Sequence, residues 1–359
     1  MKNEKVNNHY VPKFYLRNFS NNKKSVGMFI KKDSTYIADA SIKDQAYIKK
    51  LYGESGNIEN MFMLVENKAQ IIISKILLTK QLPPYESEEY SELLQFILLS
   101  QARVKKVADT QNTFMNELVK SIAELDDKVS INNLDIKINI PNLLPIQSTI
   151  ANLPLLNDLK MILIVAKRGS HFLTSDNPVV LYNQMFVTKT HPYTRSYGIA
   201  QMGTQIFFPL SSEVCLCLFD SVIYKCKGLT KNILRLNNKR KIIALNVLFY
   251  INSYNYIFFK NKVSHKYIKS IADRVSNMTL PQNVFPALKG IVLLHNDCVK
   301  QKVDLDFFKT NSPFMGLPLP PTLLPPTRPY AEEIMNKEGE WRKFVDDLWN
   351  KYSLKVPKG

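Results

Sequence analysis

The run His9-Tyr10-Val11-Pro12-Lys13-Phe14-Tyr15-Leu16-Arg17-Asn18-Phe19 is dense in aromatic and cationic side chains. Pro12 biases the residue before it toward extended backbone, so residues 9–12 are predicted to be non-helical. Residues 13–19 are then predicted to form a short helical turn. Its aromatic residues would face inward, while Lys13 and Arg17, four positions apart, would share another face. We therefore expect the run to be anchored on the core and to present polar side chains beside it.

Apolar patterns outside this run predict both helices and strands. Apolar residues from Ile58 to Ile76 recur at helical spacing, and a second helix is predicted to begin at Glu88 with Ser87 as its N-cap. Further helices are predicted at 229–251 and at 265–274, the latter capped by Ser264. The predicted strands are 26–31, 36–38, 161–166, 171–174, 179–182, 205–210 and 214–219.

The pattern predicts an α+β protein in which a helical layer packs on a mixed or antiparallel sheet. Residues 1–310 would form the main domain, with 126–158 as a long loop or insertion. Prolines dominate residues 311–330, which are predicted to be a stiff linker. Within residues 331–359, an amphipathic helix is predicted over 332–352. We expect that helix to pack on its own domain or on a second copy, which would make a homo-oligomer.

The charge of the chain is unbalanced. It carries 48 Lys and Arg residues against 31 Asp and Glu residues, a formal net charge of +17. Such a field favours polyanionic partners, either nucleic acid or an anionic membrane surface. A genome rich in A and T would raise the Lys content in the same way. The charge lies in short knots such as Lys239-Arg240-Lys241, with no block long enough to indicate a disordered arm.

Cysteine usage and hydropathy favour a reduced, cytoplasmic protein without membrane insertion. The four cysteines form no C-x-x-C motif, and Cys215 and Cys217 are predicted to share one face of a buried strand. The most apolar long stretch, residues 242–259, contains Asn246 and other polar residues. We therefore predict a buried helix, or a helix followed by a strand, in place of a membrane span.

Common catalytic motifs are absent from the sequence. It has no Gly-rich phosphate loop, no G-x-S-x-G elbow and no H-E-x-x-H helix, which argues against P-loop NTPases, dinucleotide-binding dehydrogenases, α/β-hydrolases and zincins. The polar residues that stand out are His9, Glu59, Glu66, Gln101, Arg103, Asp176 and Asn246.

Each of these residues also has an ordinary structural explanation. Arg103 would form a salt bridge to Glu59 or Glu66, and Asn246 on an apolar helix would bond a neighbouring backbone group. Ser175-Asp176-Asn177-Pro178 suits a tight Asx-type turn, in which Asp and Asn cap local N–H groups and Pro fixes the exit.

Several of these motifs, taken in order, resemble a bacterial family catalogued as domain of unknown function 4238. The resemblance rests on His9-x-x-Pro12, Tyr15-Leu16-Arg17-x-Phe19, Glu59, Glu66, Gln101-x-Arg103, Thr174-Ser175-Asp176-Asn177-Pro178 and Pro209-Leu210-Ser211. It covers roughly residues 7 to 280, and the opening and the Ser-Asp-Asn-Pro motif are its most specific parts. The resemblance supplies candidate residues and implies no mechanism.

Three classes of function are open from the sequence. The first is a nuclease-like hydrolase acting on DNA or RNA, in phage defence or on a mobile element, with His9, Glu66 and Asp176 as catalytic residues. The substrate would be bound by Arg17, Arg103, Lys13 and Asn246. The metal ligands would be Glu59, Glu66 and Asp176, with Mg²⁺ as the default for oxygen ligands.

The second class is a non-enzymatic nucleic-acid-binding or sensor module, in which the same residues form a buried polar network. The third is a toxin-like enzyme acting on a nucleotide or small molecule. An open basic cleft lined by His9, Glu66, Arg103 and Asp176 would favour the first class. A closed core would favour the second, and a narrow pocket the third.

Overall fold

The computed structural model describes residues 7–53, 57–123, 138–185, 198–278, 303–310 and 327–336. The helices are α1 Lys13–Arg17, α2 Asn57–Thr79, α3 Glu88–Ala102, α4 Lys105–Ala123, α5 Leu143–Ala151, α7 Lys239–Asn252, α8 His265–Ser276 and α10 Pro329–Asn336, with short 3-10 turns η1 Ile42–Asp44 and η2 Leu153–Leu156. The strands up to the middle of the chain are β1 Asn7–His9, β2 Ser25–Ile30, β3 Thr35–Ser41, β4 Tyr47–Lys49, β5 Lys160–Ala166, β6 Thr174–Ser175 and β7 Val180–Tyr182. The later strands are β8 Gln205–Pro209, β9 Val214–Phe219, β10 Tyr224–Cys226, β11 Leu229–Thr230, β12 Ile233–Leu236, β13 Tyr256–Phe259 and β14 Phe308–Thr310.

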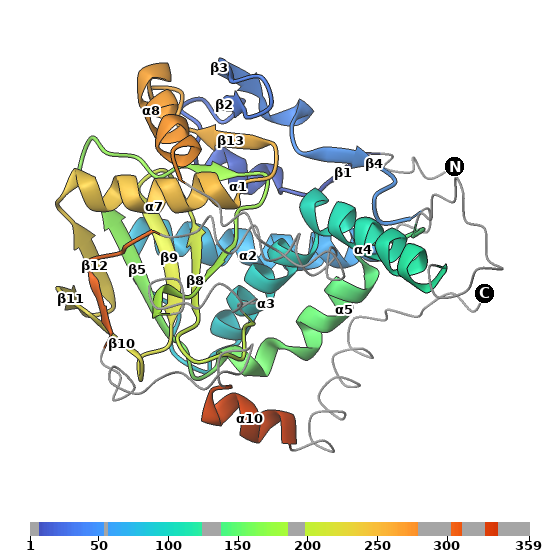
Figure 1. The fold of residues 1–359 in the computed structure, drawn as a ribbon. Coiled ribbons are helices and arrows are strands. Elements are labelled where there is room, and N and C mark those ends of the chain that lie inside the picture. Colours follow the sequence, from blue (N-terminus) through green and yellow to red (C-terminus); the bar gives the residue numbers. More distant parts are fainter. Residues whose placement is uncertain are drawn as a thin grey trace.

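The architecture is a six-stranded sheet covered by helices on both faces. Its strand order is β11-β12-β5-β9-β8-β7, in which β12 runs parallel to β5 and the other pairs are antiparallel. Helix α7 lies across one face of the sheet, and α2 and α3 lie across the other (Figure 1). The predicted α+β class, with helices packed on a mixed sheet, is confirmed.

Strand β9 shows how the sheet separates two hydrophobic cores. Leu216 and Leu218 pack with the buried residues of α2 and α3, whereas Cys215 and Cys217 pack with those of α7 and α8. This alternation follows from the two-residue period of a strand. Because both faces are covered, all six residues of β9 are buried, as the continuous apolar run predicted. The shared buried face of the two cysteines is also confirmed.

The N-terminal run folds as its sequence predicted. Strand β1 pairs antiparallel with β4, which places His9 opposite Tyr47. Helix α1 begins after Pro12, whose backbone is extended. In this helix Tyr15 is fully buried and Arg17 is exposed.

Helices α2 and α3 pack against each other beside this run. The buried residues of α2 recur at helical spacing from Ile58 to Ile76. The Ser87 side chain accepts a hydrogen bond from the Tyr90 N–H, at 3.2 Å, and so caps α3. Glu88 and Glu89 follow in the first turn, where the helix dipole favours acidic side chains. Both predicted helices are confirmed.

A second sheet carries the strands that border the candidate site. Its order is β3-β2-β13-β6. Gly27 of β2 lies opposite Phe259 of β13, and a Cβ atom on Gly27 would lie 2.3 Å from the Phe259 ring. Strand β13 also pairs with β6, which brings Thr174 and Ser175 against Phe258 and Ile257.

The predicted helix from Leu229 to Ile251 is wrong in its first third. Residues 229–236 form the hairpin β11–β12, and α7 begins at Lys239 after the Asn238 side chain caps it. The hairpin turns at Lys231 and Asn232, both with positive φ, as a two-residue primed turn requires. Lys rarely adopts positive φ, so the turn gave no clear signal in the sequence.

The segment predicted to be a long loop or an insertion, 126–158, contains α5 and η2 in its described part, and Ile146 and Leu156 pack into the core beneath α3. The prediction of a strand over residues 171–174 needs correction. Of these residues only Thr174 is in a strand, where it forms β6 with Ser175 in the smaller sheet.

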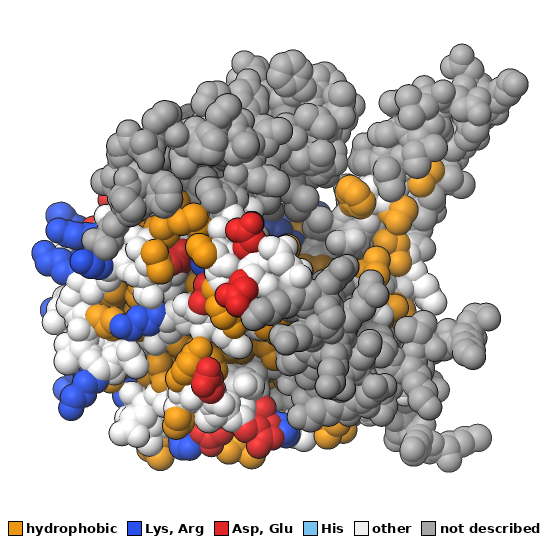
Figure 2. Space-filling view, turned by 90° about the horizontal axis from the view of Figure 1, so that it is seen from below, with side chains coloured by type: hydrophobic (Ala, Val, Ile, Leu, Met, Phe, Trp, Pro, Cys, Tyr) orange, Lys and Arg blue, Asp and Glu red, His pale blue; other side chains and the backbone are white. Residues whose placement is uncertain are grey.

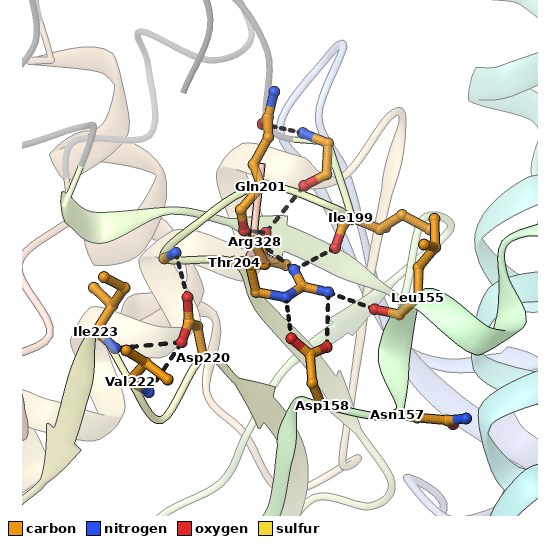
Figure 3. Close-up of polar contacts among 12 residues, drawn as sticks. Leu155, Asn157, Asp158, Ile199, Gln201, Thr204, Asp220, Val222, Ile223 and Arg328 are labelled. Carbon is orange, nitrogen blue, oxygen red and sulfur yellow. Dashed lines mark hydrogen bonds and ion pairs between the residues drawn. The ribbon is translucent and has the colours of Figure 1, made fainter. Parts of the chain in front are cut away.

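Arg328, near the C-terminal end of the described residues, is bonded to the main body of the molecule. This side chain is 2% exposed. Its guanidinium donates two hydrogen bonds to the Asp158 carboxylate, from Nε to Oδ2 at 2.7 Å and from Nη2 to Oδ1 at 3.0 Å. It also donates to the carbonyl groups of Ile199 and Gln201, as Figure 3 shows. Arg328 therefore docks the start of α10 beside η2.

The rest of the predicted linker and C-terminal helix, 311–326 and 337–352, lies outside the described residues. In the part of the chain that the structure describes, no helix has both the length and the apolar character needed to cross a membrane.

Candidate functional site

Arg103 joins three elements that carry family motifs. It lies at the C-cap of α3 and is 2% exposed. Its Nη1 donates to Glu66 Oε1 of α2 at 2.5 Å, and its Nη2 donates to the carbonyl oxygen of His9. The guanidinium lies over the Phe62 ring, 4.2 Å from its centroid. Burial is the largest single effect and opposes the positive charge, but Glu66 and Tyr52 together outweigh burial and raise the pKa of Arg103. The predicted salt bridge from Arg103 to a glutamate of α2 is therefore present.

His9 and its neighbour Asn8 complete this part of the site. His9 Nδ1 donates to the Gln45 carbonyl at 3.0 Å, and Asn8 Nδ2 donates to Glu59 Oε2 at 3.1 Å. Burial and the Lys13 ammonium group lower the pKa of His9 to about 4. The imidazole is therefore neutral at physiological pH, held by a backbone carbonyl.

Tyr15 connects the opening run to two other family motifs, those that contain Thr174 and Pro209. Its hydroxyl group lies 2.6 Å from Thr174 Oγ1 and 2.6 Å from the Pro209 carbonyl oxygen. It donates to the carbonyl and accepts from the Thr174 hydroxyl, since it has a single proton. The Tyr15 ring also stacks on Phe208, with centroids 5.1 Å apart. One fully buried side chain thus holds the opening run, β6 and β8 together.

Asp176 is a buried cap for a distant backbone segment. It is 1% exposed, and its carboxylate accepts hydrogen bonds from the N–H groups of Tyr254, Asn255 and Tyr256 at 2.8, 2.6 and 3.1 Å. The prediction that Asp176 caps local N–H groups is wrong, because those partners lie 78 to 80 positions away. Burial raises the pKa of Asp176, and the three hydrogen bonds oppose that shift.

Two amide side chains support the same region. Asn177 Nδ2 donates to the Asn252 carbonyl at 2.9 Å. Asn246 accepts from the Leu173 N–H at 2.9 Å and donates to the His171 carbonyl at 2.8 Å. Asn246 therefore bonds neighbouring backbone groups, as its position on an apolar helix predicted. It holds the segment that leads into β6.

Tyr10 follows His9 in the chain and is electrostatically coupled to Asp176. The side chain is 3% exposed. Burial and the nearby Asp176 carboxylate raise the pKa of Tyr10, and Asp109 of α4 adds to the shift. The Tyr254 hydroxyl donates to Asp109 Oδ2 at 2.7 Å and so ties α4 to the segment that Asp176 caps. Sequence reasoning missed Tyr10, Asp109 and Tyr254. Only Tyr10 had a signal, since it stands inside the opening run.

The geometry therefore brings some predicted site residues together and leaves others apart. His9, Glu66 and Arg103 are in one cluster, and Tyr10, the residue after His9, is electrostatically coupled to Asp176. Arg17 is exposed at the end of α1, and Asn246 holds a different segment. Among the described residues no three His, Cys, Asp or Glu side chains are grouped as a metal ion would require, so Glu59, Glu66 and Asp176 do not form such a group. The cluster has the character of a closed polar core.

A second candidate region is cationic and exposed. We call it the basic edge, and it consists of Lys167, Arg168, Lys231, Arg235, Lys239 and Arg240, all exposed. In the parallel pair β12–β5, Leu236 lies opposite Ala166. The turn after β5 and the start of α7 therefore lie at the same end of the sheet. Figure 2 shows Lys and Arg side chains gathered along the side of the molecule on which Figure 1 places β11, β12 and the start of α7.

The fold and these two regions define an α+β protein with a buried polar network and a cationic outer edge. Residues 7–263 match the family described as protein of unknown function (DUF4238). The match spans more than half of the chain, and the chain belongs to this family, as its motifs predicted. No curated protein and no solved structure matches the chain.

Proposed function

We propose that the protein is a nucleic-acid-binding module whose family motifs stabilise the fold. The observation that carries this proposal is a long segment without acidic residues. Residues 221–272 contain eleven Lys and Arg residues and no Asp or Glu. Nine of these cations are exposed, and none of the nine forms an ion pair with another described residue. Uncompensated charge of this kind attracts a polyanion.

The composition of this segment favours nucleic acid over a membrane surface. Peripheral membrane binding combines positive charge with apolar side chains that enter the lipid. Among the large hydrophobic side chains described as exposed, Val222 alone falls in residues 221–272. The lysines and arginines of the basic edge are instead suited to phosphate groups, with Asn232, Asn237 and Asn238 exposed between them.

The same surface favours a duplex over a single strand. Proteins that bind single strands stack bases on exposed aromatic side chains. No Phe, Tyr or Trp in the described residues 221–272 is exposed. Phosphate contacts to a duplex need only correctly spaced cations and do not read sequence. We therefore expect sequence-independent binding to double-stranded DNA or RNA.

The nuclease hypothesis draws less support from the described residues. Glu66 is ion-paired to Arg103, and Asp176 accepts three backbone N–H groups. A general base must instead have an oxygen free to reach the proton that it abstracts. No feature of the described residues specifically supports the hypothesis of a toxin-like enzyme.

Fluorescence anisotropy of a labelled duplex over a salt series tests the proposal. In the edge variant, Arg235, Lys239 and Arg240 are each replaced by Ser. The logarithm of the binding constant falls as the logarithm of the salt concentration rises. Each lost phosphate contact makes this slope shallower by about 1, so the slope of the edge variant should be shallower by about 3. The three side chains are exposed, so the melting temperature should not change.

A matched variant controls for net charge. Lys23→Ser, Lys24→Ser and Lys32→Ser remove the same charge from exposed positions around β2 and β3, and binding should change little. Equal weakening in both variants, or no binding by the wild-type protein at low salt, would overturn the proposal. The bound duplex should stay intact with Mg²⁺ or Mn²⁺. Cleavage that Asp176→Asn abolishes would restore the nuclease hypothesis.

A further inference from the structure

Helix α2 carries an apolar stripe on its outer face. Leu64, Ile71 and Leu78 are 58%, 69% and 85% exposed, although the opposite face of the helix is fully packed in the core. Residues seven apart lie on nearly the same side of a helix, displaced by about 20° per heptad. The stripe therefore runs for about 21 Å along α2. Water contact with three large aliphatic side chains is unfavourable, so the stripe suits a partner.

The spacing of the stripe is symmetrical about Ile71. Leu64 precedes it by seven residues and Leu78 follows it by seven. If a second α2 packed antiparallel on the first, with a two-fold axis at Ile71, Leu64 of each copy would meet Leu78 of the other. Ile71 would meet its own counterpart. A two-fold interface needs this kind of self-complementary surface.

The charged residues along the stripe are compensated within each chain. Lys68 and Lys75 lie on the same flank of the stripe, so in the antiparallel pair Lys68 of one copy would come near Lys75 of the other. Both lysines are ion-paired to α3, with Lys75 Nζ 2.8 Å from Glu89 Oε2 and Lys68 Nζ bonded to Glu92, which reduces the repulsion between them.

Charge further favours a second copy on this face. The chain as a whole carries +17, which repels another copy at most positions. Beside the stripe, three carboxylates of α3, at Glu88, Glu89 and Glu92, lie within ion-pair distance of two lysines. The local charge is therefore compensated, and a like-charged chain can approach.

We infer that α2 is the interface of a homodimer, in which two copies pack antiparallel through Leu64, Ile71 and Leu78. One helix pair buries less than the roughly 800 Å² per partner of a standard interface, so the dimer is reversible. This interface differs from the C-terminal helix that the sequence suggested for self-association. The inference does not depend on nucleic-acid binding.

Cysteine cross-linking tests both the dimer and its register. In a background with Cys226→Ser and Cys298→Ser, oxidised Ile71→Cys should form a covalent dimer with itself. Leu64→Cys and Leu78→Cys should cross-link efficiently only when the two variants are mixed. Leu144→Cys is the matched control, because Leu144 is 67% exposed on α5, and it should stay monomeric.

Sedimentation equilibrium of the unmodified protein supplies an independent measurement. The wild-type chain should show a concentration-dependent rise toward twice its monomer mass, and Ile71→Glu should remain monomeric with an unchanged circular dichroism spectrum. A wild-type chain that is monomeric at every soluble concentration overturns the inference. So does an Ile71→Cys thiol that is shielded from alkylation in the monomer, which would assign the stripe to another segment of the same chain.

Discussion

A buried ion pair such as Arg103–Glu66 places strict demands on the residues around it. A guanidinium that is 2% exposed must be compensated by hydrogen bonds or by charge, because its transfer from water costs several kcal/mol. Glu66 and the His9 carbonyl supply this compensation. The same requirement accounts for Tyr15 and Asp176, which also bond backbone groups far away in the sequence. Polar motifs at distant positions can thus arise from folding requirements alone.

His9 gives this network a defined pH dependence. Its pKa is 6.5 in the unfolded chain and about 4 in the folded protein, so between these values the unfolded chain binds a proton that the folded protein does not. The free energy of unfolding should therefore fall as pH drops from 6.5 toward about 4. His9→Gln should make this decline shallower in urea unfolding measured across that range.

His171 provides the comparison for this prediction. Burial also lowers the pKa of His171, so His171→Gln should remove a separate share of the decline. The double variant should be the least pH-dependent of the four proteins. A His9→Gln protein whose stability falls as steeply as that of the wild type would contradict the assigned environment of His9.

The candidate site could be predicted from the sequence only in part. The Arg103 salt bridge was predictable, because arginine and glutamate on neighbouring helices are complementary side chains. The partners of Asp176 could not be predicted. Its carboxylate oxygens accept hydrogen bonds from backbone N–H groups, and every residue except proline carries such a group. Asp109 was missed for a related reason. It stands in an ordinary amphipathic helix and gains its role only when Tyr254 packs against α4.

At the scale of elements, Gly27 determines how closely β2 and β13 can pack. A Cβ atom there would lie 2.3 Å from the Phe259 ring and 3.0 Å from the Phe259 carbonyl oxygen. Phe259 is completely buried, so its ring cannot move without disturbing the core. Gly27→Ala should lower the free energy of unfolding by about 1–3 kcal/mol, as overpacking usually does, measured by urea denaturation.

Gly198→Ala is the control for this substitution. A Cβ atom at position 198 would lie 3.3 Å from the flexible side chain of Gln201. A change of less than about 0.5 kcal/mol is expected there, as for most surface substitutions. If Gly27→Ala proves equally mild, the two strands are not held as closely as the structure describes.

Elements with strong local signals were the ones that the sequence predicted well. Helices α3 and α8 begin after serine caps, and the buried strands β5, β8 and β9 are continuous apolar runs. The hairpin β11–β12 was missed because Leu229, Ile233 and Leu236 also recur at the helical spacing i, i+4, i+7. The segment forms strands and not a helix because β12 pairs with β5, a strand more than 60 residues away in the sequence. Tertiary context overrides local propensity in such short elements.

At the scale of the whole molecule, the sheet separates two kinds of surface. The face covered by α2 and α3 also holds the opening run, whose Tyr15 reaches β6 and β8. The other face is covered by α7, which begins at the basic edge. A homodimer through α2 would therefore leave both basic edges uncovered. A dimer could place both of its basic edges on one duplex. It would then bind more tightly than a monomer, because the second edge is held at a high effective concentration once the first is bound.

Arg328 is the contact that joins the C-terminal segment to this body. The guanidinium is buried against Asp158 and three backbone carbonyl groups, so Arg328→Met should cost about 3–5 kcal/mol of local stability. Because α10 follows directly, its amide hydrogens should exchange with deuterium much faster, while those of β5 and β9 stay protected. Arg17→Met, at an exposed position on α1, should leave exchange in α10 unchanged. Unaltered protection of α10 in Arg328→Met would show that apolar packing against η2 holds this helix without the arginine.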